Sequence, residues 1–304
     1  MLSEREVYFN GEFRPWNEAN VHIMSHSFGR GSEIFEVIGF HETPAGPAVF
    51  RLDEYIARFR KSAELLEMEL PLSQEALEAA VLQLVKRSGL KSGFLKMHGF
   101  YPDISFNVLP PQKRIQVAVC VFSAEEMFGA RKDIARIGVT AFVSHWRRLD
   151  PQTVPIEAKV AGNYVNGMVA RMESRAKGFD YAVLLDTQGF IAEGGTEALF
   201  LVREGRLMAP ALGTVLKSIT RKTILDVAGA MGIETFIGPL KPGLLDEADE
   251  LFFSGTATKV IPVRQVGDRI LSGIPGPVTR RLAERMAEIT SGRDAQFKHW
   301  LFPA

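Results

Sequence analysis

The most informative segment of this chain covers residues 157–167 and reads Glu-Ala-Lys-Val-Ala-Gly-Asn-Tyr-Val-Asn-Gly. Its lysine, Lys159, stands just before a helix that apolar spacing predicts from about Asn163 to Lys177, with Gly178 as its stop. The small residues around Lys159 would let a bulky ligand approach. Burial lowers the pKa of a lysine and frees its amine for Schiff-base chemistry. From these residues alone, an ordinary solvated lysine is still the commoner explanation.

The sequence before this segment predicts strands joined to helices. Asn10-Gly11 stands between two short strands and indicates a hairpin, because Asn-Gly tolerates the positive φ angles of a tight turn. Further elements follow the same rules of periodicity. Strands are predicted over residues 32–40, 94–100 and 115–122, and helices over 53–69 and 73–87.

A second pattern begins after a charged stretch without a clear period, residues 123–133. We interpret this stretch as the connection between a small α+β domain, residues 1–122, and a larger domain, residues 134–304. The elements predicted after it are a strand over 136–145, a helix over 163–177, a meander of strands over 181–202 and helices over 220–231 and 277–290. Strict alternation of strand and helix is absent, so the fold class is α+β rather than doubly wound.

The composition narrows the function further. Hydrophobic residues make up 46% of the 304 residues and charged residues 24%, which is typical of a globular chain and excludes disordered, collagen-like and coiled-coil classes. Because 36 basic residues balance 36 acidic ones, nothing favours a nucleic-acid partner. No apolar run is long enough for a membrane span. The single cysteine, Cys120, lies in an apolar run and fits a reducing cytoplasm.

Several familiar motifs are missing from the chain. No dinucleotide fingerprint, no phosphate-binding loop with its lysine and no nucleophile elbow is present. His22 and His26 have the spacing of a metal-binding pair on a helix, but no acidic or cysteine partner is arranged near them. We therefore predict no metal site.

The spacing Lys159-x3-Asn163-Tyr164 resembles the lysine motif of class IV, branched-chain-type aminotransferases, which use pyridoxal phosphate. Further family signatures follow in the expected order, and the resemblance runs from about Val7 to beyond Pro277. The matching segments are 21–26 (Val-His-Ile-Met-Ser-His), 58–63 (Arg-Phe-Arg-Lys-Ser-Ala), 189–200 (Gly-Phe-Ile-Ala-Glu-Gly-Gly-Thr-Glu-Ala-Leu-Phe), 216–221 (Leu-Lys-Ser-Ile-Thr-Arg) and 254–257 (Ser-Gly-Thr-Ala).

The resemblance implies a role for each matched residue toward pyridoxal phosphate. Lys159 would be the catalytic residue, binding the cofactor covalently and then moving a proton on the substrate. Glu193 would face the pyridine nitrogen and keep it protonated, and Tyr164 would donate to the ring oxygen. The phosphate would be held by the start of a helix, whose unpaired N–H groups attract anions. The residues implied for the phosphate are Arg58, Ser218, Ile219, Thr220 and Thr256.

Some positions depart from the family pattern. The family usually has Asn where this chain has Ala198, so the side chain that would support the Glu193 loop is changed. In the first pocket strand the family's Tyr, Gly and basic residue are replaced by Arg30, Val37 and Gly39, and Phe94-Leu95-Lys96 stands for its Tyr-x-Arg. We expect Arg30, or otherwise Lys96, to bind the acceptor carboxylate. The substrate-binding residues implied are Arg30, Phe35, Val37, Phe94, Lys96, Thr256 and Ala257.

The resemblance thus implies the two-domain α+β fold of fold type IV pyridoxal phosphate enzymes, with the cofactor between domains. It implies a homodimer in which the loop Phe106 to Pro111 closes a neighbour's pocket. The expected activity is transamination between an amino acid, branched-chain as the first choice, and a 2-oxo acid such as 2-oxoglutarate. The alternatives are a D-amino acid or (R)-amine transaminase, a lyase like aminodeoxychorismate lyase, and a non-catalytic binding protein, which retention of Lys159, Tyr164 and Glu193 disfavours.

Overall fold

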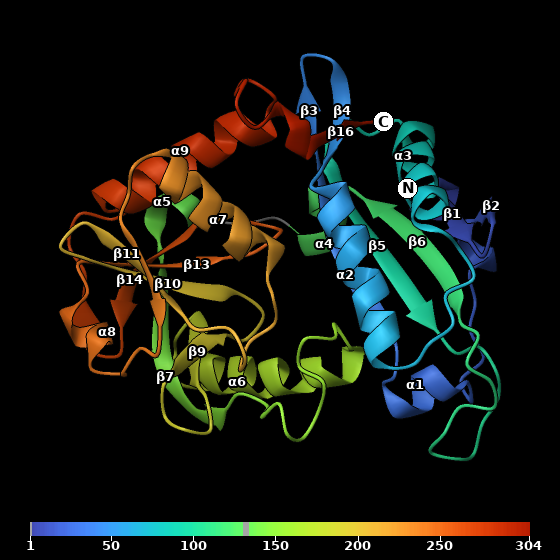
Figure 1. Cartoon of the computed structure of the whole chain (residues 1–304), viewed down its shortest axis with the longest axis horizontal. Coiled ribbons are helices and arrows are strands. Elements are labelled where there is room, and N and C mark those ends of the chain that lie inside the picture. The colour runs from blue at the N-terminus through green and yellow to red at the C-terminus, as the bar shows by residue number, and fades with distance from the viewer. Residues whose placement is uncertain (1, 130–133) are drawn as a thin grey trace. The chain divides into compact units, whose positions relative to one another are not determined.

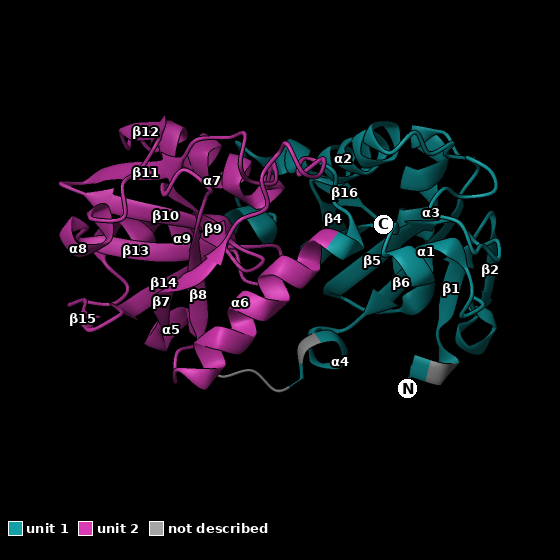
Figure 2. Ribbon diagram, turned by 90° about the horizontal axis from the view of Figure 1, so that it is seen from below, with its two compact units in different colours: residues 1–131, 158–162, 288–304 teal, residues 132–157, 163–287 magenta. Residues whose placement is uncertain are grey.

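The computed structural model describes residues 2–129 and 134–304, which form two compact units (Figure 2). Unit 1 draws on residues 1–131, 158–162 and 288–304, and unit 2 on residues 132–157 and 163–287. The chain therefore crosses between units more often than a contiguous division into 1–122 and 134–304 would require. Of the expected connection, residues 130–133 lie outside the described residues, and Ala124–Phe128 form helix α4.

Unit 1 is built on an antiparallel sheet with the strand order β16-β4-β3-β5-β6-β1-β2. Its hairpin β1–β2 turns at Asn10 and Gly11, whose φ angles are 53° and 108°, so this prediction is confirmed. The strands are β1 (Glu6–Phe9), β2 (Glu12–Pro15), β3 (Ile34–Thr43), β4 (Gly46–Phe50), β5 (Gly93–Phe100), β6 (Gln116–Phe122) and β16 (Leu301–Pro303).

Two amphipathic helices cover one face of this sheet, α2 (Leu52–Leu65) and α3 (Gln74–Ser88) (Figure 1). Phe59 of α2 is fully buried, and its ring lies so close to Gly99 of β5 that a Cβ there would be 2.8 Å from it. The other face carries half-buried side chains. Short elements complete the unit: η1 (Leu2–Glu4), η2 (Trp16–Glu18), α1 (His26–Arg30), α4 and η4 (Lys298–Trp300).

Unit 2 contains a mixed sheet in the order β12-β11-β10-β13-β14-β7-β8-β9, with β15 paired to β14. The pairs β11–β12, β14–β7 and β7–β8 are parallel, and the other pairs are antiparallel, as an α+β fold allows. The strands are β7 (Val139–Arg147), β8 (Tyr181–Leu185), β9 (Ile191–Gly194), β10 (Ala198–Arg203), β11 (Arg206–Pro210), β12 (Thr235–Gly238), β13 (Glu250–Ser254), β14 (Ile261–Val266) and β15 (Arg269–Ile270).

One strand prediction was wrong at its start. The chain over Ile134–Ile137 forms the helical turn α5, and β7 begins only at Val139. Gly138 separates the two with a φ of 71°, a left-handed conformation that ends the turn. The other helices of unit 2 are α6 (Tyr164–Ala176), α7 (Ile219–Ala230), α8 (Leu244–Glu247) and α9 (Pro277–Thr290), and the last residues of α9 belong to unit 1. The short helix η3 (Ala161–Asn163) begins in unit 1 and ends at the first residue of α6's segment in unit 2. Within the described residues, no helix is long and apolar enough to cross a membrane.

Candidate active site

Lys159 lies in a segment of unit 1 that runs antiparallel to the start of β3. Its backbone N–H donates to Oγ of Ser62 at 2.9 Å, and its carbonyl accepts from the N–H of Phe35 at 3.0 Å. The residue is only 9% exposed, and its Nζ lies 4.6 Å from the centroid of the Phe35 ring. Both the backbone and the side chain of Lys159 are therefore held in place, unlike those of a solvated surface lysine.

The small residues beside Lys159 let two backbones come close together. A Cβ on Gly162 would lie 3.1 Å from the carbonyl oxygen of Gly31, and Gly31 itself has a φ of 65°. Gly31 also accepts the Gly162 N–H at 2.9 Å. The small residue at position 162 is thus explained by this backbone contact, which holds the Lys159 segment against Gly31, just before β3.

Four of the expected substrate-binding residues share the half-buried face of the unit 1 sheet. Val37 on β3 stands opposite Lys96 on β5, Gly39 stands opposite Phe94, and Nζ of Lys96 lies 5.6 Å from the Phe35 ring. Phe35 and Val37 are two residues apart on one strand, so their side chains point to the same face. The structure therefore brings Phe35, Val37, Phe94 and Lys96 together within unit 1.

Two further polar residues lie on this face, and sequence reasoning missed them. His98 stands opposite Phe35, and its Nδ1 lies 2.5 Å from Oε1 of Glu33, two residues before Phe35. The two-residue spacing of Phe94, Lys96 and His98 would have placed His98 beside the expected lysine. Cys120 of β6 stands opposite Lys96, and burial raises the pKa of its thiol to about 11, so it stays protonated.

Arg30 lies against the loop that was expected to close a neighbour's pocket. Its Nη2 donates to the carbonyl of Phe106 at 3.1 Å and its Nε to that of Asn107 at 3.5 Å. One turn earlier on α1, buried His26 contacts the carbonyl of Val108 through Nε2 at 2.8 Å. Helix α1 therefore holds this loop by its backbone, and a carboxylate would share the Arg30 guanidinium with the loop carbonyls.

Arg58 turns inward from the flank of α2 to the sheet. Its Nε and Nη2 donate to the two carboxylate oxygens of Glu36 at 2.7 and 2.6 Å, and the Glu36 side chain is fully buried. A bidentate pair of this kind fixes the guanidinium in a single orientation. Sequence reasoning named Arg58 but not its partner, although Glu36 stands in the same strand as Phe35 and Val37.

In unit 2, Glu193 at β9 is 7% exposed and forms a buried ion pair. One of its carboxylate oxygens lies 2.6 Å from Nε of Arg148, whose Nη1 donates to Oδ1 of Asn166 on α6. A second buried cation, Arg221, donates to the carbonyl of Pro210 at 2.7 Å. Burial lowers the pKa of Arg221, while the Glu193 charge opposes that effect.

Tyr164 begins α6 in the same unit, and two glycines bring that helix next to the turn after Glu193. A Cβ on Gly167 would lie 2.0 Å from the carbonyl oxygen of Gly195, so no larger residue fits there without movement. Position 198, where the family usually has asparagine, is an alanine in this chain, so its side chain forms no hydrogen bond to support this turn. Instead, Glu197 accepts from Thr196 Oγ1 at 2.7 Å and lies 2.8 Å from Nη2 of Arg171.

The start of α7 is suited to bind an anion. Ser218 caps the helix by accepting the N–H of Arg221 at 3.1 Å, and Ile219 and Thr220 are 5% and 3% exposed. In the described part of the chain, the backbone N–H groups of Ile219 and Thr220 donate to no protein acceptor. Buried, unpaired N–H groups at a helix start, together with the helix dipole, attract a phosphate.

The turn after β13 carries the last expected residues, Thr256 and Ala257. Gly255 N–H donates to the carbonyl of Thr258 at 3.2 Å, and Nζ of Lys259 donates to that of Thr256 at 2.7 Å. Burial lowers the pKa of Lys259 to about 8. The fully buried Oγ of Ser254 has no hydrogen-bond partner among the described residues. An unpaired buried hydroxyl beside this turn is a group that a ligand could satisfy.

The family model for amino-transferase class IV matches residues 33–266, which include Lys159, Glu193 and the α7 start. The chain belongs to the class IV aminotransferases. The enzyme is therefore a pyridoxal-phosphate-dependent transaminase. Among the described residues of this class IV aminotransferase, no cluster of three or more His, Cys, Asp or Glu side chains could hold a metal ion.

The similarity to curated relatives and to solved structures extends over almost the whole of this chain. The chain is 34% identical over 300 residues to the branched-chain-amino-acid aminotransferase of Salmonella typhimurium, covering 98% of this chain and 96% of that protein. The corresponding enzyme of Escherichia coli K12 is 34% identical over 298 residues, with 97% and 96% covered. The crystal structure of a branched-chain aminotransferase from Thermoproteus uzoniensis with norvaline has a TM-score of 0.92 at 31% identity, with 98% of this chain and 99% of that chain covered.

Proposed function

We propose that this class IV aminotransferase moves amino groups between branched-chain amino acids and a 2-oxo acid such as 2-oxoglutarate. The observation that carries the proposal is the apolar face of Phe35, Val37 and Phe94, with the ammonium of Lys159 against the Phe35 ring. Aliphatic side chains need such a face, because burying them there removes apolar surface from water. The names of its full-length relatives support the same substrate class.

We propose that Lys159 is the catalytic residue, which binds pyridoxal phosphate covalently and moves the proton at the substrate Cα. When bound, the cofactor supplies an electron sink for the bonds at that carbon. Glu193 would hold the proton on the pyridine nitrogen, with Arg148 keeping its carboxylate oriented. Tyr164 would donate to the ring oxygen. The phosphate would be bound by the Arg58 guanidinium, by the start of α7 at Ser218, Ile219 and Thr220, and by Thr256.

We also propose that the active form is a homodimer. On unit 1, the loop held by α1 exposes Phe106, Val108 and Leu109 at 79%, 78% and 74%. On unit 2, Val165, Met168 and Met172 form an exposed stripe along α6, at 54%, 53% and 62%. Exposed apolar surface of this kind is typical of an interface between proteins. Light scattering on the purified protein tests the dimer, and a monomer with full activity would contradict it.

The proposed partners are otherwise small molecules, with neither nucleic acid nor a membrane among them. We propose the cytoplasm as the compartment. The half-buried Cys120 thiol, the only cysteine of the chain, supports this because it has no partner for an internal disulfide.

The decisive experiment for substrate class is half-reaction spectroscopy. The pyridoxal phosphate form is mixed with L-leucine, L-isoleucine and L-valine, with their D-enantiomers, and with (R)- and (S)-amines, and the loss of its visible absorption is followed. We expect the L-branched-chain set to react fastest. Faster reaction of the D-amino acids or (R)-amines would replace the proposal by the alternative transaminase, and pyruvate release from aminodeoxychorismate would indicate a lyase.

A further inference from the structure

The Glu33–His98 pair lies next to the catalytic lysine within unit 1. Glu33 accepts the N–H of Ala161 through its carbonyl at 2.8 Å, just as Phe35 donates to the carbonyl of Lys159. The backbones of Glu33 and Phe35 therefore both pair with the segment that carries Lys159. Their two-residue spacing places their side chains on the same face. His98 stands directly across from Phe35, whose ring contacts the Lys159 ammonium. Phe35 is therefore the residue that links the position of the pair to that of the Lys159 ammonium.

The pair lines a cavity of about 250 Å³ whose walls are otherwise mostly apolar. Its two serines are engaged by the backbone, since Ser25 accepts the N–H of Phe28 and Ser27 that of Tyr101. Glu33 and His98 remain 27% and 23% exposed, so the cavity reaches both. In a largely apolar cavity the polar atoms of Glu33 and His98 are the groups to which a ligand can form hydrogen bonds. The other lining residues are Phe9, Ala19, Val21, Phe28, Phe100, Ala118 and Cys120.

The geometry points to the chemistry that the pair can bind. An ionised carboxylate only accepts hydrogen bonds, so with Glu33 ionised it is Nδ1 of His98 that donates to Oε1. Within the described chain, Nε2 of His98 and the second oxygen of Glu33 have no other partner. In the neutral ring Nε2 is also an acceptor. With the ring neutral and the carboxylate ionised, the cavity offers two acceptors and one negative charge, which favour a donor and disfavour a carboxylate.

We propose that Glu33 and His98 form a polar subsite of the substrate pocket that binds a hydrogen-bond donor at the end of the substrate side chain. The donor is a hydroxyl or an ammonium, and the subsite extends the substrate range beyond purely aliphatic side chains. The inference rests on the proposed function, because it assumes that the face next to Lys159 receives the substrate.

The test compares substrates that differ only in the terminal group. Norleucine, δ-hydroxynorvaline and ornithine end in a methyl, a hydroxyl and an ammonium on chains of equal length, and glutamate ends in a carboxylate. Half-reaction rates are measured for both enantiomers of each, in the wild type and in Glu33→Leu and His98→Leu. The ratio of hydroxynorvaline to norleucine should fall about 10- to 100-fold in either variant, as expected for the loss of a hydrogen bond to a charged group.

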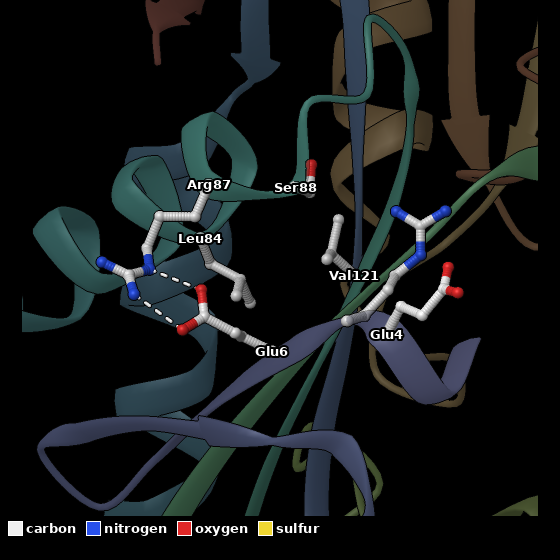
Figure 3. A pocket seen from close by; sticks show the side chains of 7 residues that line it. Glu4, Glu6, Leu84, Arg87, Ser88 and Val121 are labelled. Atoms are coloured by element: carbon white, nitrogen blue, oxygen red, sulfur yellow. Dashed lines mark hydrogen bonds and ion pairs between the residues drawn. The ribbon is translucent and has the colours of Figure 1, made fainter. Parts of the chain in front are cut away.

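A matched control removes a similar pair elsewhere in unit 1. Glu6 accepts from Nε and Nη2 of Arg87 at 2.7 and 2.6 Å, in a different cavity of about 370 Å³ (Figure 3). Glu6→Leu should leave all substrate ratios unchanged. If the leucine variants fail to fold, Glu33→Gln keeps the shape and one acceptor oxygen while it removes the charge. That variant should lose ornithine preference more than hydroxynorvaline preference.

A second measurement separates this inference from the proposed function. The unreactive acids δ-hydroxyvaleric acid and hexanoic acid carry the same two side-chain ends without an amine, and their binding is measured by calorimetry. Tighter binding of the hydroxy acid, lost in His98→Leu, supports the subsite even if no substrate turns over. Unchanged substrate ratios and unchanged acid affinities in both leucine variants would overturn it, whereas failure to bind pyridoxal phosphate would refute only the proposed function.

Discussion

Replacing Glu193 by glutamine tests the central electrostatic element of the site. The change keeps the size of the side chain and one acceptor oxygen but removes the negative charge that faces Arg148 at 2.6 Å. A neutral amide cannot hold a proton on the pyridine nitrogen, so the cofactor would lose most of its electron-withdrawing power. Glu193→Gln should therefore still bind pyridoxal phosphate but transaminate far more slowly.

The size of this effect follows from the burial of Glu193. The residue is 7% exposed, so solvent screens its charge weakly and its attraction to a facing cation is strong. If that attraction stabilises the transition state by about 3 kcal/mol, kcat falls at least ~100-fold. The same change leaves the Arg148 charge without its anionic partner. Breaking a buried pair costs about 3–5 kcal/mol of folding free energy, so the variant should also unfold more easily.

Three measurements on the same samples distinguish these effects. Absorption spectroscopy reports cofactor binding, single-turnover half-reactions report the chemical step, and urea unfolding reports stability. Glu197→Gln is the matched control, because Glu197 is a neighbouring buried carboxylate that faces Arg171 instead of Arg148. Wild-type half-reaction rates in Glu193→Gln would refute the reasoning, because another group would then protonate the ring. Equal losses in both variants would point to loop packing instead.

Four further predictions address other parts of the chain. Borohydride should trap the cofactor on Lys159 in the wild type but not in Lys159→Ala, and a labelled peptide with another lysine would exclude the assignment. Arg30→Ala should weaken 2-oxoglutarate binding ~10- to 100-fold, while a carboxylate-free amine reacts at the normal rate. Equal losses in 2-oxoglutarate affinity and in the rate of the amine half-reaction would indicate that the guanidinium serves only the loop carbonyls. Gly167→Ala should lower the Tm because its Cβ would lie 2.0 Å from a backbone oxygen, whereas Gly229→Ala, with open space in α7, should hold or raise it. Folding lowers the pKa of Lys259 from 10.5 to about 8, so between these pH values the folded state binds fewer protons than the unfolded state. The free energy of unfolding, measured by urea titration, should therefore rise with pH in this range. If Lys259→Met shows the same rise, Lys259 is not its origin.

The sequence predicted local structure well wherever neighbouring residues decide it. Ser73 accepts the N–H of Ala76 as the cap of α3, and Gly89 ends that helix with a φ of 65°. Both roles depend on a few consecutive residues, so the pattern indicates them directly. The prediction failed where a single glycine outweighed strand propensity, since Gly138 ends the α5 turn before β7 begins.

The motif around Lys159 likewise determined the family, because its chemistry requires particular residues at short spacing. The partners of those residues come from distant parts of the chain, and only the tertiary structure decides them. Glu36 meets Arg58 across 22 residues and Glu33 meets His98 across 65, each pair joined by strand register or by a helix packed on a sheet. Periodicity shows which face a side chain occupies, but not what stands opposite. That depends on the order of strands in the sheet, which long-range packing selects.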